Sequence, residues 1–244
     1  MSTPSSVLDP SLSPSRLRSE ARKARRRLYP STVLYPVYSL GLLTLALRTA
    51  PWRPVVLWFL GGMVAWTLME YAVHRYVLHG RFPAGPSLYR RFTHKYFDPL
   101  HWEHHARPWD GNHVNGTLKD TLPFSAVLVG LAFLTPLPTG PVFIAGLLLA
   151  YVLEEWIHQS VHFYEFRNPY FRYIRRHHLY HHSPRGTNAG YGLSNGFWDV
   201  VWRTRFPPDE RQALHRRRPP TRTRRTGRPP HDLPPDPTTQ AGAH

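Results

Sequence analysis

The sequence of 244 residues contains no cysteine and few acidic residues. Without cysteine there can be no disulfides, no thiolate metal ligands and no cysteine nucleophile. Asp and Glu total 15 against 31 Lys and Arg, so the formal net charge is +16. An HExxH motif is also missing, which argues against a membrane zinc protease. The chain is instead rich in two residue types, with 16 His and 26 Pro.

The two ends of the chain show no apolar pattern of the kind that builds a core. Residues 1–30 are rich in Ser, Pro and Arg, and residues 206–244 are rich in Pro and Arg. We expect both segments to be disordered basic tails, which leaves residues 31–205 as one membrane-embedded domain. Arginines beside apolar segments suit anionic lipid head groups. No nucleic-acid motif accompanies them, so we expect no nucleic-acid partner.

Four apolar stretches lie between the tails, at 32–47, 54–73, 122–138 and 141–153. A membrane-spanning helix needs about 20 mostly apolar residues. The second stretch meets this length, the first and third are marginal, and the fourth depends on a polar extension through residue 158. Buried helices of a soluble protein are the alternative, but four such runs are too much for a core of this size. We therefore predict about four transmembrane helices.

The positive charges predict an orientation for these helices. If the four stretches alternate across the membrane, only Arg48 and Arg53 of the 31 Lys and Arg lie on one side. The positive-inside rule then places both termini and both large loops in the cytoplasm. No cleavable signal peptide is evident, because the first apolar run begins only after about 30 residues.

Ten histidines fall into four clusters, all on the predicted cytoplasmic side. Their spacings are HxxxxH, HxxHH, HxxxH and HxxHH, and the residues are His74, His79, His101, His104, His105, His158, His162, His178, His181 and His182. Residues at i, i+3 and i+4 share a helix face, so each of the last three clusters can present several ligands together. The i, i+5 pair His74 and His79 can reach one metal only if the helix loosens or ends there.

We predict that these ten histidines bind metal, because burying ten unliganded imidazoles would be costly. Imidazole suits Fe, Zn, Cu and Ni, and one zinc ion takes only three or four protein ligands. Ten ligands therefore favour a dinuclear centre with about five each. We expect four carboxylates to orient imidazole N–H groups, namely Glu70, Glu103, Glu154 and Glu155. The remaining histidines are expected not to bind metal, with His177 beside a ligand: His94, His113, His177, His215, His231 and His244.

Over about residues 65–204 these clusters resemble those of the fatty acid hydroxylase/sterol desaturase superfamily, which are membrane di-iron oxygenases. The HxxxxH cluster and the run from His104 to Gly111 are similar to the fatty acid 2-hydroxylase branch. The Gly-Tyr-Gly at 190–192, followed by Trp198 and Asp199, is also similar to the family's signature. The stretch after Gly111 departs from the family pattern, which leaves the acyl chain and head group open.

The resemblance implies an all-α integral membrane protein whose cytosolic helical cap holds the His-rich dinuclear metal site. It implies a monooxygenase with two Fe ions on the ten histidines, with Zn as a substitute in purified protein, and O₂ as co-substrate. The substrate would be a membrane lipid, first of all a fatty acid or fatty acyl chain. No His-Pro-Gly-Gly haem motif is present, so electrons would come from a separate reductase, ferredoxin or cytochrome b5-like protein.

Other functions stay open on the sequence. A related sterol, carotenoid or alkane oxygenase, or a desaturase, would need the same ligand pattern, because hydroxylation and desaturation share the first hydrogen abstraction. A non-catalytic membrane metal-binding protein is a further alternative. Metal transport is disfavoured, because transporters hold their ligands near mid-membrane and these clusters lie at or beyond the span ends.

Overall fold

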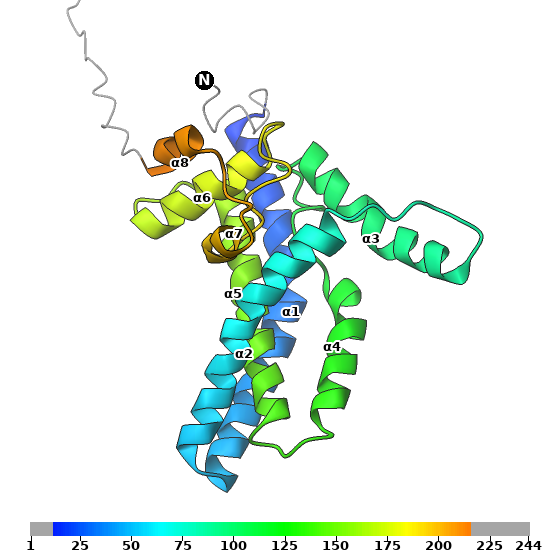
Figure 1. The fold of residues 1–244 in the computed structure, drawn as a ribbon, viewed down its shortest axis with the longest axis vertical. Coiled ribbons are helices and arrows are strands. Elements are labelled where there is room, and N and C mark those ends of the chain that lie inside the picture. Colours follow the sequence, from blue (N-terminus) through cyan, green and yellow to red (C-terminus); the bar gives the residue numbers. More distant parts are fainter. Residues whose placement is uncertain (1–11, 216–244) are drawn as a thin grey trace, which may run out of the picture.

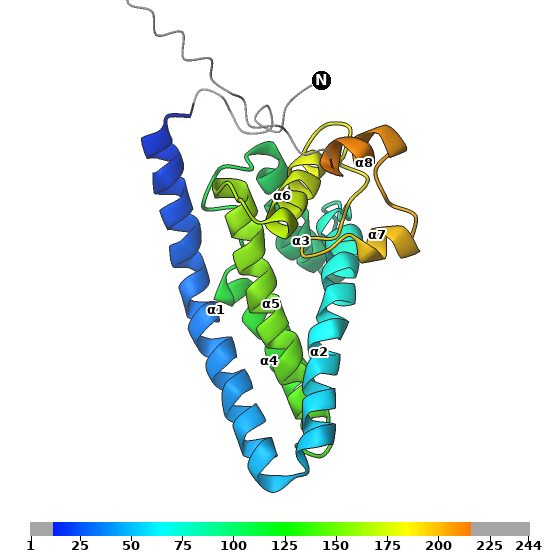
Figure 2. The same ribbon diagram turned by 90° about the vertical axis from the view of Figure 1, so that its left-hand side faces the viewer.

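The computed structural model describes residues 12–215, and the elements within that range are all helices. Three long helices pack side by side in Figures 1 and 2: α1 (Pro14–Thr49), α2 (Trp52–Ala72) and α5 (Gly140–Phe163). Helix α4 (Leu118–Ala132) runs beside them. At the end away from the α1–α2 connection lie η2 (Val73–Leu78), α3 (Leu88–Ala106), α6 (Pro169–His181), α7 (Phe197–Val201) and α8 (Pro208–His215). The prediction of an all-α fold is confirmed.

Glycines allow α2 and α5 to approach each other closely. A Cβ atom on Gly62 would lie only 1.9 Å from the carbonyl oxygen of Phe143, and one on Gly146 only 2.0 Å from that of Phe59. Small residues at such contacts are typical of helix packing in membranes. Helix α5 is therefore packed against α1 and α2 along most of its length, and it carries His158 and His162 into the part of the molecule where the short helices gather.

Three helices are long and apolar enough to cross a membrane, namely α1, α2 together with η2, and α5. Their outward faces expose large apolar side chains, among them Val33, Val37, Leu57 and Val64. A surface of this kind is stable against lipid but would promote aggregation in water. The chain is thus an integral membrane protein.

The third apolar stretch gives a shorter helix than the prediction of about four spans required. Helix α4 has 15 residues, whereas a spanning helix needs about 20. A capping box formed by Thr117 and Asp120 starts it at Leu118, and it ends at Ala132, ahead of the prolines at 136 and 138. Apart from Lys119 near its start, its exposed side chains are apolar, as in Phe124 and Val127.

Regular structure extends further towards both ends than we expected. Residues 14–30, which we expected to be disordered, form the first turns of α1. Leu17, Ala21, Ala24 and Leu28 recur at helical spacing, and Ala21 and Ala24 pack against Val114 and Phe163. This repeat of small apolar residues is easily overlooked among the arginines.

At the other end, Phe206 is buried against His177 and Tyr180. Helix α8 follows it, so helical structure continues beyond residue 205. The rest of the two expected tails, residues 1–11 and 216–244, lies outside the described residues.

Candidate metal centre

The structure sorts the ten clustered histidines into two groups of five. The first, called the His74 group, consists of His74, His79, His101, His105 and His181. The second, called the His104 group, consists of His104, His158, His162, His178 and His182. Within each group, one ring nitrogen from every histidine lies within 4.8 Å of the others. Each group therefore converges on a single point.

Helical spacing decides which histidine joins which group. On α3, His101 and His105 stand at i and i+4 and face the first group, whereas His104 between them faces the second. Helix α6 does the reverse, because His181 joins the first group and the i, i+4 pair around it joins the second. Segment α2–η2 serves only the first group and α5 only the second. The two groups therefore share two of their supporting helices.

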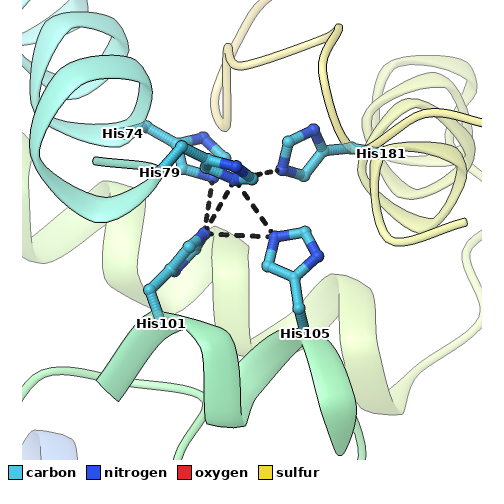
Figure 3. Close-up of side chains that lie close together, drawn as sticks. All are labelled: His74, His79, His101, His105 and His181. Atoms are coloured by element: carbon cyan, nitrogen blue, oxygen red, sulfur yellow. Dashed lines mark hydrogen bonds between the residues drawn. The ribbon is translucent and has the colours of Figure 1, made fainter. Parts of the chain in front are cut away.

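A π turn brings His74 and His79 onto the same side of their segment. The backbone N–H of His79 donates to the carbonyl of His74 at 3.0 Å, an i→i+5 bond. This wider turn removes the angular offset that an ideal α-helix would impose on the pair. The sequence indicated that the helix must loosen or end here, and it does both, since the π segment stops before Gly80. Figure 3 shows both rings pointing toward His101 and His105.

The close contacts within each group join Nε2 atoms. In the His74 group, the Nε2 of His79 lies 2.9 Å from that of His181 and 3.0 Å from that of His101. In the His104 group, the corresponding distances run from 2.7 Å between His162 and His178 to 3.3 Å between His158 and His162. Two nitrogens about 2.1 Å from one metal ion and at right angles would be about 3.0 Å apart. The donors of each group thus fit around one ion.

Burial keeps the imidazoles outside the spanning helices neutral. It lowers the pKa of His104, His178 and His181 well below the ordinary value, and the positive charge that neighbouring imidazoles would carry lowers it further. Burial also lowers the pKa of His79 to about 4 and, with smaller contributions from His79 and His158, that of His105 to about 3. Neutral imidazole is the form that binds metal, so the rings are ready to act as ligands near neutral pH.

Backbone carbonyl groups orient two rings of the His74 group. The Nδ1 of His74 donates to the carbonyl of Tyr191 at 2.6 Å, and the Nδ1 of His181 donates to that of Ala189 at 2.7 Å. A carbonyl can only accept, so the proton of each ring sits on Nδ1 and leaves the Nε2 lone pair for a metal. These carbonyls carry no side-chain signal, and only the Gly-Tyr-Gly at 190–192 marks the segment in the sequence.

The carboxylates have other partners than the imidazole N–H groups we expected. Glu70 accepts hydrogen bonds from two backbone N–H groups, of Leu193 and Ser194. Glu103 forms an exposed ion pair with Arg107, and Glu155 accepts from the Asn115 side chain at 2.6 Å. The structure records no bond between these three carboxylates and any of the ten rings.

Three further histidines of the described residues lie outside both groups. His94 donates from Nδ1 to the carbonyl of Phe82, and His113 pairs with Asp110 at 2.9 Å. His177 is buried, with its Nε2 3.5 Å from the Asp199 carboxylate. The side chain of His215, and all of His231 and His244, lie outside the described part of the chain.

Known hydroxylases are similar to this chain in sequence. The chain is 31% identical over 153 residues to a fatty acid 2-hydroxylase of Mus musculus, a match covering 62% of this chain and 40% of the mouse protein. It is 32% identical over 144 residues to a dihydroceramide fatty acyl 2-hydroxylase of Arabidopsis thaliana, covering 59% of this chain and 58% of the plant protein. The match thus spans less than two thirds of either relative.

A solved structure titled as full-length Scs7p, with only the hydroxylase domain visible, has a similar fold. The TM-score is 0.62 at 25% sequence identity, and the match covers 75% of this chain and 67% of that one. A model of the fatty acid hydroxylase family matches residues 59–204, a region that includes all ten histidines. The chain belongs to the fatty acid hydroxylase family.

Proposed function

We propose that the ten histidines bind two iron ions and that the protein is an O₂-dependent hydroxylase of a lipid C–H bond. The substrate that the relatives' names indicate is a fatty acid or fatty acyl chain. One observation carries this proposal above the others. Ten imidazoles converge in two adjacent groups of five, each with the spacing that a single ion requires.

The reaction balances with a reductant outside the chain. The substrate R–H, O₂, two electrons and two protons give R–OH and water. Two bound irons supply the redox and dioxygen chemistry that no side chain of this protein offers. Each iron would be held by the five histidines of one group, and imidazole is a donor that suits iron. The electrons come from a separate donor protein, of the reductase, ferredoxin or cytochrome b5 type.

The residues around the site hold the ligands in place. The carbonyls of Ala189 and Tyr191 fix the protonated nitrogen of two rings. The His104 group is buried, whereas His79 and His105 of the other group are partly open. We therefore assign the approach of substrate and dioxygen to the side of the His74 group. The two groups lie at the end of the molecule away from Arg48 and Arg53, which flank the α1–α2 connection. Because the other Lys and Arg are expected on the side of the groups, the positive-inside rule favours a cytoplasmic site and cytoplasmic termini.

We propose residues 31–205, the bounds expected from the sequence, as the core of the hydroxylase domain. The basic segments before and after it contribute helical turns at 14–30 and 208–215.

A lipid comparison tests this function. The protein and a His104→Ala/His181→Ala variant are expressed in a host with a compatible electron donor, and extracted lipids are searched by mass spectrometry under ¹⁸O₂. We expect a hydroxy-acyl species carrying one ¹⁸O only with the intact protein. The His231→Ala variant, which changes a histidine outside the four clusters, serves as the control and should behave like the intact protein.

Other outcomes of the same experiment select the alternatives. A labelled sterol, carotenoid or alkane product would keep the oxygenase and change the substrate class. Loss of two hydrogens without label would indicate a desaturase. If metal-loaded protein with a working donor leaves every lipid class unchanged, a non-catalytic metal-binding protein is the better description.

A further inference from the structure

Residues 189–194, called the carbonyl loop, contact only one of the two histidine groups through hydrogen bonds. The carbonyls of Ala189 and Tyr191 accept from His181 and His74, and both rings belong to the His74 group. The Tyr191 ring also stands edge-on to His74, His79 and His181 at centroid distances of 5.2–5.8 Å. The position of this loop therefore decides where two ligating nitrogens of that group point.

Asp199 holds the loop from one side. Its carboxylate accepts the backbone N–H of Tyr191 at 2.9 Å and that of Gly192 at 3.0 Å. It also accepts the hydroxyl of Thr204 at 2.7 Å, and the carbonyl of Thr204 accepts the N–H of Gly190. Asp199 is 1% exposed. A buried carboxylate with this many donors fixes its surroundings firmly, because each charge-assisted bond is strong and its loss leaves a charge unpaired.

Glu70 holds the loop from the other side. Its Oε1 accepts the N–H of Leu193 at 2.8 Å and that of Ser194 at 2.7 Å, and the residue is 3% exposed. Glu70 and His74 stand one turn apart on the same segment, so they share a face. This face binds the loop through two kinds of hydrogen bond, because Glu70 accepts from backbone N–H groups of the loop and His74 donates to one of its carbonyls.

The loop's backbone conformation depends on its glycines. Gly190 has a φ of +71°, a region that other residues rarely adopt. A Cβ atom on Gly192 would lie 1.8 Å from the carbonyl oxygen of Asn195. The two glycines let the chain turn tightly enough for successive N–H groups to reach Asp199 while the carbonyls face the histidines.

The rings of the His104 group have less support of this kind: a backbone carbonyl, that of Pro108, stands near His162, and among the described residues no bond from the carbonyl loop reaches this group. The buried Nδ1 atoms of His104, His178 and His182 have no hydrogen-bond partner among the described residues. Those rings are held by packing against each other, with centroids of His104 and His182 4.5 Å apart. The two groups therefore differ in how their rings are oriented, although each has five donors.

We propose that Glu70 and Asp199 are positioning residues that act through the carbonyl loop on His74 and His181, and so control metal affinity in the His74 group alone. This inference rests on the proposed dinuclear centre. Orienting partners of metal-bound histidines typically change metal affinity 10- to 100-fold. When either carboxylate is neutralised, the affinity of the His74 group for its ion should fall by that factor. The affinity of the His104 group for its ion should not change.

The test measures metal content rather than activity. The full-length protein in detergent and the variants Asp199→Asn and Glu70→Gln are loaded with Co²⁺, dialysed against a graded chelator, and analysed for bound metal per chain. We expect two ions in the parent protein. In each variant one ion should be lost at a chelator concentration about 10- to 100-fold lower than in the parent, while the second ion leaves at the parental concentration.

A matched variant separates this role from general destabilisation. Ser39→Ala removes a buried 2.7 Å hydrogen bond from α1 to the carbonyl of Ala145, away from the loop. It should lower thermal stability while both ions leave at the parental concentrations. Parental release of both ions from Asp199→Asn and Glu70→Gln would overturn the inference, and so would equal weakening of both. A parent protein that binds two ions but modifies no lipid would overturn only the proposed function, whereas one that binds no ion would overturn both proposals.

Discussion

His105 and His182 stack ring on ring, with centroids 4.2 Å apart and planes inclined by 26°, although each belongs to a different group of five. Their helices, α3 and α6, each supply histidines to both groups. The contact therefore forms a shared wall between the two sites. Because the two rings are in direct contact, displacing one of them changes the surroundings of the other.

The first prediction concerns this wall. Replacing His105 by Ala removes a donor of the His74 group and leaves a cavity beside His182. We expect less than one ion per chain by elemental analysis and a loss of the proposed hydroxylase activity of at least about 100-fold. His113→Ala, which alters a histidine paired with Asp110 outside both groups, should keep both ions. Full activity of the His105 variant would show that this histidine is not a ligand.

The second prediction concerns the pH dependence of the metal-free protein. Burial lowers the pKa of His79 from 6.5 to about 4 and that of His105 from 6.5 to about 3. Between these values and 6.5 the unfolded chain binds protons on both residues while the folded chain does not. The free energy of unfolding is therefore highest above about pH 6.5 and decreases as the pH falls towards 3.

Thermal unfolding in detergent after chelation measures this effect. Tm should be lower at pH 5 than at pH 7.5, and the difference should shrink in a His79→Gln/His105→Gln variant, which cannot bind these protons. The metal-loaded protein should unfold at a higher temperature than the metal-free one at pH 7.5, because binding to the folded state stabilises it. A metal-free Tm that rises as the pH falls would contradict the neutral buried imidazoles.

The sequence could predict which histidines share a helix face, because that depends only on spacing along a helix. It could also indicate that the segment from His74 to His79 must depart from an α-helix, although not that a π turn would result. It did not reveal the helix at 14–30, since its repeat of small residues around Ala21 and Ala24 carries little hydrophobic signal. That these ten residues bind metal stays a prediction.

The orienting groups were harder to predict than the clusters themselves. Imidazole N–H groups need an acceptor, and the carboxylates Glu70 and Glu155 were reasonable candidates from their place near the ligands. The acceptors that the structure shows are the carbonyls of Ala189 and Tyr191. Every residue has a carbonyl, so its use depends on the path of a loop and leaves no mark in side-chain composition. Glu70 contacts the rings only indirectly, because it accepts hydrogen bonds from the N–H groups of the loop that carries these carbonyls.

The third prediction concerns the close approach of α2 and α5. Gly62→Ala would place a Cβ atom 1.9 Å from the carbonyl oxygen of Phe143, so the helices must separate. Such overpacking typically costs about 1–3 kcal/mol, and Tm should fall by several degrees. Gly41→Ala on α1 is the matched control, because a Cβ atom there would meet no atom of a neighbouring element within 4 Å. An unchanged Tm for Gly62→Ala would show that the helices are less tightly packed than described.

The last prediction concerns the first turns of α1, which cover the segment that follows the second histidine cluster. Ala24 is fully buried and packs with Ala21 against Val114 and Phe163. Phe163 directly follows a histidine of the His104 group, and Val114 lies nine residues after His105. Leucine at position 24 would therefore push on both segments that lead away from the proposed metal centre.

We expect Ala24→Leu to lower Tm, by an overpacking penalty of about 1–3 kcal/mol, and to release metal at a lower chelator concentration than the parent protein. Arg22→Leu changes an exposed residue of the same helix and should leave both properties unchanged. If Ala24→Leu lost stability while its metal release stayed parental, α1 would support the fold without supporting the site. If neither property changed, the first turns of α1 would not pack on the 107–116 segment in the membrane-bound protein.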